Sequence, residues 1–336
     1  MTNTVSQPVT IASVTAQDGD RVLRDLQSDV LPRWMKVFGS TAPGTVLGPG
    51  QGGLVWLDVV VDSLDDVPDR IEHDIAVELA DPSPPLLPKT LTESVAPTDV
   101  QKVDPIVIGA PLDGPHWLDG NSCCEVTAHR AAVSPLNGEL WAPERFAIDF
   151  VALDADGKMF KGDRTKLESY AYYGANVHAV ADGKVVAVRT DLPEQTAGAN
   201  PSGLPIDEYG GNHVVQDIGN GHYAFYAHLQ TGDGVKVKVG DDLTKGQVVG
   251  LLGNSGNTDG PHLHFHVMDG IDPLVANGLP FEIDSFELES RIASDENLGA
   301  VAEAGAAAEY APNVSAGQRK DESPLYLDIM KFDVGS

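Results

Sequence analysis

The chain has 336 residues, 42% of them hydrophobic, a length that supports a sizeable core divided between about two domains. Its 50 acidic and 22 basic residues give a net charge of −28. This charge argues against bare nucleic acid or an anionic membrane as partner, because phosphate contacts need clustered Lys and Arg. The sequence lacks a run of about 18 apolar residues, so no transmembrane helix is expected, and its N-terminus does not have the pattern of a signal peptide.

The first 104 residues carry no catalytic pattern and predict a small β-rich domain. Apolar residues alternate with polar ones over residues 55–61 and again over 75–79, which is typical of half-buried strands. Residues 81–89 contain four prolines, the composition of a loop or linker. We therefore expect an N-terminal β-rich domain with a Pro-rich linker over residues 1–104.

Residues 105–290 predict a second, larger β-domain. Asn-Gly or Asp-Gly pairs at 137–138, 156–157, 182–183 and 220–221 mark tight turns between strands. Such spacing predicts an antiparallel sheet that curls on itself, so the fold class is mainly β. Residues 190–211 lack periodicity and are expected to form a long loop beside the sheet.

The last segment, residues 291–336, is expected to be a C-terminal arm with a final strand. Its alanine-rich part, residues 300–311, predicts a short helix or a flexible arm, and the alternating residues that follow predict the strand.

The only cysteines, Cys123 and Cys124, are neighbours. A bond between neighbours would close a strained ring, so we expect two free or partly buried thiols. Cys124 precedes His129 by five residues, which leaves a metal-binding role as a weaker alternative.

The most informative segment is GPHLHFH, residues 260–266. Its histidines recur at spacing two, so a strand places His262, His264 and His266 on one face. The alternate apolar residues then face a core: Leu263, Phe265 and Val267. Aligned imidazoles suit a metal site with a neighbouring general base, and the alternative is a histidine stripe on a surface strand.

Three other segments contribute to this pattern. Residues 144–150 predict a strand that carries Asp149 in an apolar end, and residues 225–229 predict a strand that delivers His228. The glycine-rich loop 253–260 leads into the histidine strand.

Together these segments resemble the M23 family of LytM/lysostaphin-type zinc metallopeptidases, which cleave peptidoglycan. The matching stretches are GANVHAVADGKVVAV (174–188), YAHL (226–229) and GNSGNTDGPHLHFHV (253–267), and the resemblance spans about residues 105–285. It implies an extracellular or cell-envelope endopeptidase that acts on peptidoglycan peptides with one Zn²⁺.

The resemblance also implies roles for individual residues. Asp149 and His264 correspond to zinc ligands, and His228 and His262 to the two catalytic histidines beside the metal. Zinc accepts nitrogen and oxygen ligands, and a catalytic site leaves one position for water.

One position departs from the family pattern. The family has a ligand histidine four residues before the Asp, where this chain has Arg145, which stays protonated and cannot bind zinc. We expect His129 to supply the missing nitrogen from a strand that forms a hairpin with the Asp149 strand through the 137–138 turn. A plain two-residue turn would point His129 to the wrong face, so this hypothesis requires a bulge or a longer loop.

The Arg145 departure also supports an alternative function. The chain would then be a catalytically inactive LytM-like domain that binds cell wall or activates a partner hydrolase.

Four further residues are candidates for supporting roles, each with a plain structural alternative. His266 would orient a ligand, Arg145 would pair with a carboxylate or bind a substrate carboxyl group, His178 would line the groove, and Tyr226 would donate a hydrogen bond near the metal. The alternative for Tyr226 is packing beneath the sheet.

Overall fold

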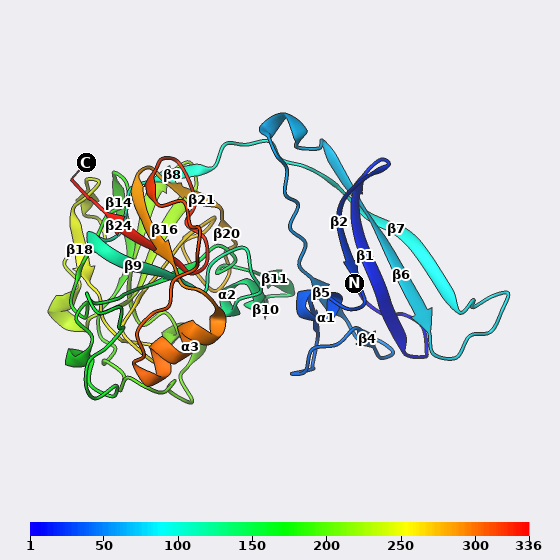
Figure 1. Cartoon of the computed structure of the whole chain (residues 1–336), viewed down its shortest axis with the longest axis horizontal. Helices are drawn as coiled ribbons and strands as arrows, with labels where there is room; N and C mark the ends of the chain where they lie inside the picture. The colour runs from blue at the N-terminus through cyan, green and yellow to red at the C-terminus, as the bar shows by residue number, and fades with distance from the viewer. Residues whose placement is uncertain (336) are drawn as a thin grey trace. The chain divides into compact units, whose positions relative to one another are not determined.

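The computed structural model describes residues 1–335, which form two compact units, one from Met1 to Asp104 and the other from Pro105 onward. The described residues are mainly β, as the sequence predicted (Figure 1). No helix within residues 1–335 has the length and apolar character needed to cross a membrane.

The first unit contains an antiparallel sheet in the order β2-β1-β6-β7, with β4 also paired to β1. Its elements are β1 (Val9–Asp18), β2 (Arg21–Gln27), α1 (Leu31–Trp34), β3 (Met35–Val37), β4 (Val46–Leu47), β5 (Gly53–Val55), η1 (Leu64–Asp66), β6 (Arg70–Leu79) and β7 (Thr90–Asp99). Alternating residues of β1, such as Val9 and Ile11, are buried in a core with Leu26 and Leu47.

Two predictions for this unit have different outcomes. The strand predicted over residues 75–79 is confirmed as the end of β6. The strand predicted over residues 55–61 is wrong, because β5 ends at Val55, where its pairing with the short strand β3 also ends. The Pro-rich residues 81–89 form the loop between β6 and β7.

The second unit is built on a large antiparallel sheet in the order β17-β14-β15-β16-β19-β12-β9-β24-β22-β23, with β20 paired to β19. Its strands are β8 (Ile106–Ile108), β9 (Gly114–Gly120), β10 (Ser134–Leu136), β11 (Glu139–Trp141), β12 (Ile148–Ala152), β13 (Asn176–His178), β14 (Gly183–Arg189), β15 (Asn212–Gly219), β16 (His222–Leu229), β17 (Asp242–Leu243), β18 (Val248–Leu251), β19 (Leu263–Met268), β20 (Gly278–Leu279), β21 (Phe281–Ile283), β22 (Phe286–Arg291), β23 (Gly317–Arg319) and β24 (Asp328–Phe332). Its helices are α2 (Ala128–Ala131), α3 (Asp295–Ala304), η2 (Leu167–Ser169), η3 (Ile206–Glu208) and η4 (Gly232–Gly234).

The register of three central strands determines which residues meet on the sheet. In β19, His264 lies opposite Asp149 of β12 on one side and opposite Ala227 of β16 on the other. The apolar residues between the histidines, Leu263 and Phe265, are fully buried in the main core. The predicted division into a histidine face and an apolar face is therefore confirmed for residues 263–267, while His262 precedes the strand.

The C-terminal residues belong to the same sheet, since β24 pairs with both β9 and β22. Helix α3 begins after Ser294, whose side chain accepts a hydrogen bond from the Asn297 N–H, a common N-cap arrangement. It ends at Gly305, which adopts a left-handed conformation with φ 62°. The helix therefore covers only the first part of the alanine-rich segment.

The core predicts a large effect for one substitution in the central strand. Phe265 is fully buried, and its ring lies 5.3 Å from that of Tyr226 and 5.4 Å from that of Phe281, centroid to centroid. We expect Phe265→Ala to lower the free energy of unfolding by about 3–5 kcal/mol through lost burial and the cavity left behind. Urea denaturation measures this, with the exposed Ile271→Ala as control, expected to change stability by less than about 0.5 kcal/mol. Equal losses in the two variants would contradict the assigned core.

Candidate metal centre

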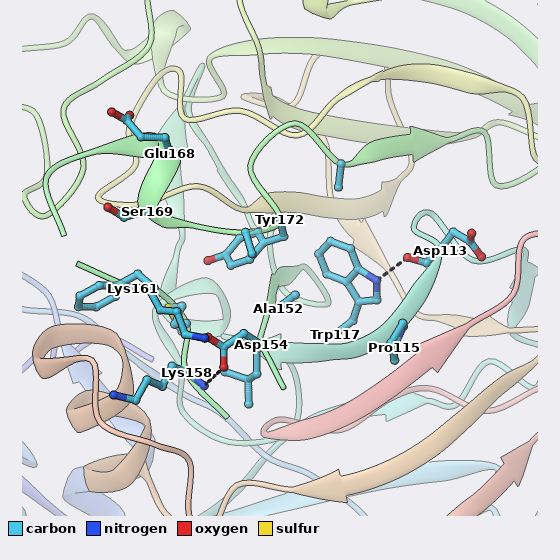
Figure 2. A pocket seen from close by; sticks show the side chains of 15 residues that line it. Asp113, Pro115, Trp117, Ala152, Asp154, Lys158, Lys161, Glu168, Ser169 and Tyr172 are labelled. Carbon is cyan, nitrogen blue, oxygen red and sulfur yellow. Dashed lines mark hydrogen bonds and ion pairs between the residues drawn. The ribbon is translucent and has the colours of Figure 1, made fainter. Parts of the chain in front are cut away.

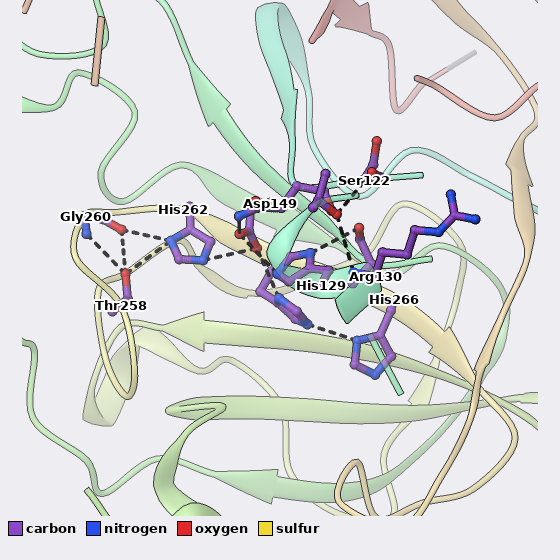
Figure 3. Close-up of polar contacts among 12 residues, drawn as sticks. Ser122, His129, Arg130, Asp149, Thr258, Gly260, His262 and His266 are labelled. Carbon is purple, nitrogen blue, oxygen red and sulfur yellow. Dashed lines mark hydrogen bonds and ion pairs between the residues drawn. The ribbon is translucent and has the colours of Figure 1, made fainter. Parts of the chain in front are cut away.

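The carboxylate of Asp149 lies at the centre of a group of imidazoles (Figure 3). Its Oδ2 is 3.2 Å from His129 Nε2, and its Oδ1 is 3.3 Å from His262 Nε2. The same Oδ1 is 3.1 Å from His264 Nδ1. The neighbouring side chain in β12, Phe150, is fully buried in the core on the other face of the sheet. Strand alternation therefore directs Asp149 to the histidine face.

Three of these residues can hold a metal ion. His129, Asp149 and His264 each offer one ligand atom, and these atoms all lie within 4.8 Å of one another. Two imidazole nitrogens and a carboxylate oxygen are ligands that zinc commonly takes in proteins. The structure thus brings together the three residues that the sequence singled out as metal ligands.

His129 reaches this centre by a route that the sequence analysis did not predict. The Asn137-Gly138 turn does pair Leu136 with Glu139, but the β10–β11 ladder extends only to Ser134 and Trp141. His129 therefore lies on the short helix α2, and the prediction that it lies on a strand is wrong. Because the ladder stops before His129, the strand register that would have turned it to the wrong face does not apply.

The orientation of His129 is fixed by the residues before β12. The strand predicted over residues 144–150 begins only at Ile148, because residues 143–146 form a turn. The carbonyl oxygen of Ala147 then lies 3.3 Å from His129 Nδ1. A carbonyl only accepts, so Nδ1 carries a proton and Nε2 is the ring nitrogen that faces Asp149.

The segment from Asn121 to Thr127 links Asp149 to helix α2. The Asn121 amide donates to Asp149 Oδ2 at 2.8 Å, and the Thr127 hydroxyl donates to the Asn121 carbonyl oxygen at 2.7 Å. Thr127 is also the N-cap of α2, and its hydroxyl oxygen accepts from the Arg130 N–H. Sequence reasoning missed both residues, since a lone Asn or Thr in a loop carries no spacing signal.

Within this segment, Cys123 and Cys124 form a disulfide with each other. The prediction of two free thiols is therefore wrong. With both sulfur atoms in this bond, Cys124 does not offer a thiolate to a metal, and the weaker metal-binding alternative does not hold either.

His228 enters the centre through an unusual backbone conformation. It is the next-to-last residue of β16 and has φ 59°, a left-handed value that is uncommon for a residue other than glycine. Its ring lies 4.6 Å from that of His262 and 5.8 Å from that of His264. Its Nδ1–H donates to the Ser255 carbonyl oxygen at 2.7 Å, which leaves the Nε2 lone pair free.

His262 is held by the glycine-rich loop that precedes β19. Its Nδ1–H donates to the Gly260 carbonyl oxygen at 2.9 Å, and the Thr258 hydroxyl lies 3.2 Å from the same nitrogen (Figure 3). Its Nε2 therefore faces Asp149. The loop itself is anchored by Glu194, whose carboxylate accepts the backbone N–H of Asn254.

Electrostatics separate the histidines into two groups. Burial alone lowers the pKa of His129, but the Asp149 carboxylate outweighs it and raises the pKa to about 9. Burial also lowers the pKa of His262, but the Asp149 carboxylate again outweighs it, and the pKa of His262 is raised. Burial, reinforced by neighbouring imidazoles, lowers the pKa of His228 and of His266 well below the usual histidine value.

The remaining candidates lie in different surroundings. Tyr226 is buried in the core, where its hydroxyl donates to Gln216 Oε1 at 2.6 Å and accepts from the Val180 N–H at 2.9 Å. The prediction that Tyr226 donates a hydrogen bond near the metal is therefore wrong, because its hydroxyl is hydrogen-bonded beneath the sheet. His178 ends β13, and its Nδ1–H donates to the Gly246 carbonyl oxygen at 2.9 Å.

Arg145 and His266 are both close in sequence to residues of the candidate metal site. The Arg145 guanidinium lies over the Phe146 ring, 5.4 Å from its centroid, in the turn before β12. His266 Nδ1 is 3.0 Å from His264 Nε2, so His266 contacts one of the three potential ligands directly.

A separate pocket of about 420 Å³ occurs in the second unit (Figure 2). Its wall is largely apolar and includes Trp117, Met159, Phe160 and Tyr172. The lining includes none of the residues predicted for the metal centre, so this pocket is a different feature from the site above.

The fold and the site define a mainly β protein whose sheet carries a group of histidines and an aspartate able to hold a metal ion. Comparison with known proteins shows that residues 166–276 match the model of peptidase family M23, so this segment is similar to that family. The match includes His228, His262 and His264, while His129 and Asp149 precede it.

Individual relatives are similar over limited parts of their length. Peptidoglycan DD-endopeptidase ShyA of Vibrio cholerae is 34% identical over 95 residues, which cover 28% of this chain and 18% of ShyA. Glycyl-glycine endopeptidase ALE-1 of Staphylococcus capitis is 32% identical over 109 residues, which cover 32% of this chain and 25% of ALE-1. The chain thus spans about a fifth to a quarter of these relatives. Among solved structures, the lysostaphin catalytic domain of Staphylococcus simulans is 22% identical with a TM-score of 0.27, and covers 49% of this chain and 88% of that one.

The raised pKa of His129 predicts how the stability of the metal-free protein depends on pH. The pKa of His129 is about 9 in the folded state and about 6.5 in the unfolded state. Protonated His129 therefore stabilises the fold fully below pH 6.5, and this stabilisation is lost as the pH rises through 9. We therefore compare the free energy of unfolding of wild type with that of His129→Gln. The advantage of wild type should be about 3 kcal/mol larger at pH 6 than at pH 10. Denaturant titrations of both proteins in EDTA measure this difference, and a constant difference across that range would contradict the His129–Asp149 ion pair.

Proposed function

We propose that the second unit is a zinc-dependent endopeptidase that hydrolyses peptide cross-links of bacterial peptidoglycan. The observation that carries this proposal is the convergence of His129, Asp149 and His264 on one point, with His228 and His262 beside them. Matched relatives named as peptidoglycan DD-endopeptidases and a glycyl-glycine endopeptidase support the substrate class. Since peptidoglycan lies outside the cytoplasm, we propose that the chain acts in the cell envelope or outside the cell.

The metal would be held by His129 Nε2, the Asp149 carboxylate and His264 Nδ1. When bound there, zinc supplies Lewis acidity, which polarises a peptide carbonyl and makes water more acidic. Asn121 donates to one Asp149 oxygen and so limits the orientations open to the carboxylate. Arg145 at the family's usual ligand position is compatible with this set, because His129 provides the nitrogen from α2.

The two other histidines divide the proton transfers between them. Because the Ser255 carbonyl fixes the proton of His228 on Nδ1, its Nε2 is free to accept a proton from the attacking water. Burial lowers the pKa of His228, which keeps this nitrogen unprotonated at neutral pH. His262 Nε2, held toward Asp149 by the Gly260 carbonyl, is placed to donate a proton to the oxyanion or the leaving amine.

The metal requirement predicts a loss of both binding and cleavage in one variant. His264→Ala removes a ligand nitrogen, so we expect zinc affinity to fall more than about 100-fold and release of soluble fragments from purified sacculi to stop. EDTA should stop wild type in the same way, and added zinc should restore it. His222→Gln, at the half-buried start of β16, is the matched control and should cleave like wild type. Cleavage that persists in EDTA would contradict the proposal.

The general-base role predicts a different pattern for His228. We expect His228→Gln to bind zinc like wild type but to cleave about 10²–10⁴-fold more slowly, because the proton acceptor is lost while the ligands remain. Zinc content and initial rates on sacculi, with casein in parallel, are measured on the same preparations. Zinc-loaded wild type that binds sacculi without cleaving them would instead favour the inactive wall-binding domain, and preferential cleavage of casein would contradict the substrate class.

A further inference from the structure

The contact between His264 and His266 has a chemical consequence that depends on where the protons lie. Both side chains project from the same face of β19, and His264 Nε2 lies 3.0 Å from His266 Nδ1. Both are buried, with 5% and 1% of their surface exposed. At this distance one nitrogen must donate and the other must accept.

The metal centre decides which nitrogen donates. His264 Nδ1 is the atom that faces Asp149, at 3.1 Å, and a nitrogen that binds a metal carries no proton. With a metal bound to Nδ1, neutral His264 would carry its proton on Nε2, which would donate to His266 Nδ1. His266 in turn must carry its own proton on Nε2.

This arrangement leaves His266 Nε2 buried and, within residues 1–335, without a hydrogen-bond partner. An unsatisfied buried donor is unfavourable for folding, and an apolar side chain at this position would avoid it. The ring of His266 is also held against Phe225, 5.0 Å away between centroids, on the strand directly opposite. The fold thus retains a costly polar group in a fixed orientation beside a potential ligand.

We propose that His266 is a positioning residue that accepts the Nε2 proton of His264 and so holds His264 in the tautomer whose Nδ1 is free to bind the metal. Ligand histidines usually donate their second N–H to a carboxylate, a carbonyl or water. A neutral imidazole in this place fixes the tautomer without adding a negative charge beside Asp149. This inference rests on the proposed metal centre.

Zinc affinity tests the proposal independently of catalysis. His266→Phe keeps the ring against Phe225 but removes the acceptor, and we expect the zinc dissociation constant, measured by competition with a chelating dye, to rise about 10–100-fold. His266→Gln keeps an acceptor oxygen and should stay within about threefold of wild type. His213→Phe is the control, because His213 packs on the same Phe225 at 5.1 Å while its Nδ1 bonds the Gly211 carbonyl.

A spectroscopic readout separates positioning from general packing. In ¹⁵N-histidine-labelled, zinc-loaded protein, ¹H–¹⁵N spectra should show the His264 proton on Nε2 in wild type and in His266→Gln, with the Nε2 signal shifted or exchange-broadened in His266→Phe. If His266→Phe does not fold, His266→Leu against His266→Gln provides the same comparison.

The outcomes distinguish failure of the His266 proposal from failure of the proposed function. Zinc binding by wild type with an unchanged dissociation constant in His266→Phe overturns the positioning role alone. A wild type that binds no zinc overturns the proposed function, and this inference with it.

Discussion

The arrangement of the second unit depends on a single carboxylate, Asp149, held in a largely buried position among imidazoles. An isolated charge in such a place is strongly unfavourable. Here His129, His262 and His264 surround it within 3.1–3.3 Å. Burial raises the pKa of Asp149, but His129 and His262 outweigh it and hold the pKa well below its usual value. The imidazoles around the carboxylate compensate for its burial. The same group of nitrogen and oxygen atoms is suited to bind a divalent cation.

The positions of backbone elements bring these side chains together. Strand pairing sets Asp149 opposite His264, and the glycine-rich loop directs His262 through the Gly260 carbonyl. The left-handed conformation of His228 turns its ring into the centre, where strained backbone is often retained for function. Backbone carbonyls accept from Nδ1 of His129, His228 and His262, so the fold sets Nε2 as the ring nitrogen that each histidine presents to the centre.

The sequence predicted those features that depend on regular spacing. The spacing-two histidines predicted the two faces of β19, and the resemblance brought Asp149, His228 and His264 together as one set. The need for a second nitrogen ligand predicted His129, but on a strand. The short helix α2 depends on Thr127 and on where the β10–β11 ladder stops, and neither has a periodic signal. The extent of β5, the Cys123–Cys124 disulfide and the buried hydroxyl of Tyr226 likewise depend on tertiary contacts that no local pattern records.

The most direct test of the account is anomalous diffraction at the zinc absorption edge from crystals of the full chain grown with zinc. The account predicts one strong peak about 2.0–2.2 Å from His129 Nε2, an Asp149 oxygen and His264 Nδ1. A peak held by other residues, or none at this position in crystals soaked with zinc, would contradict it.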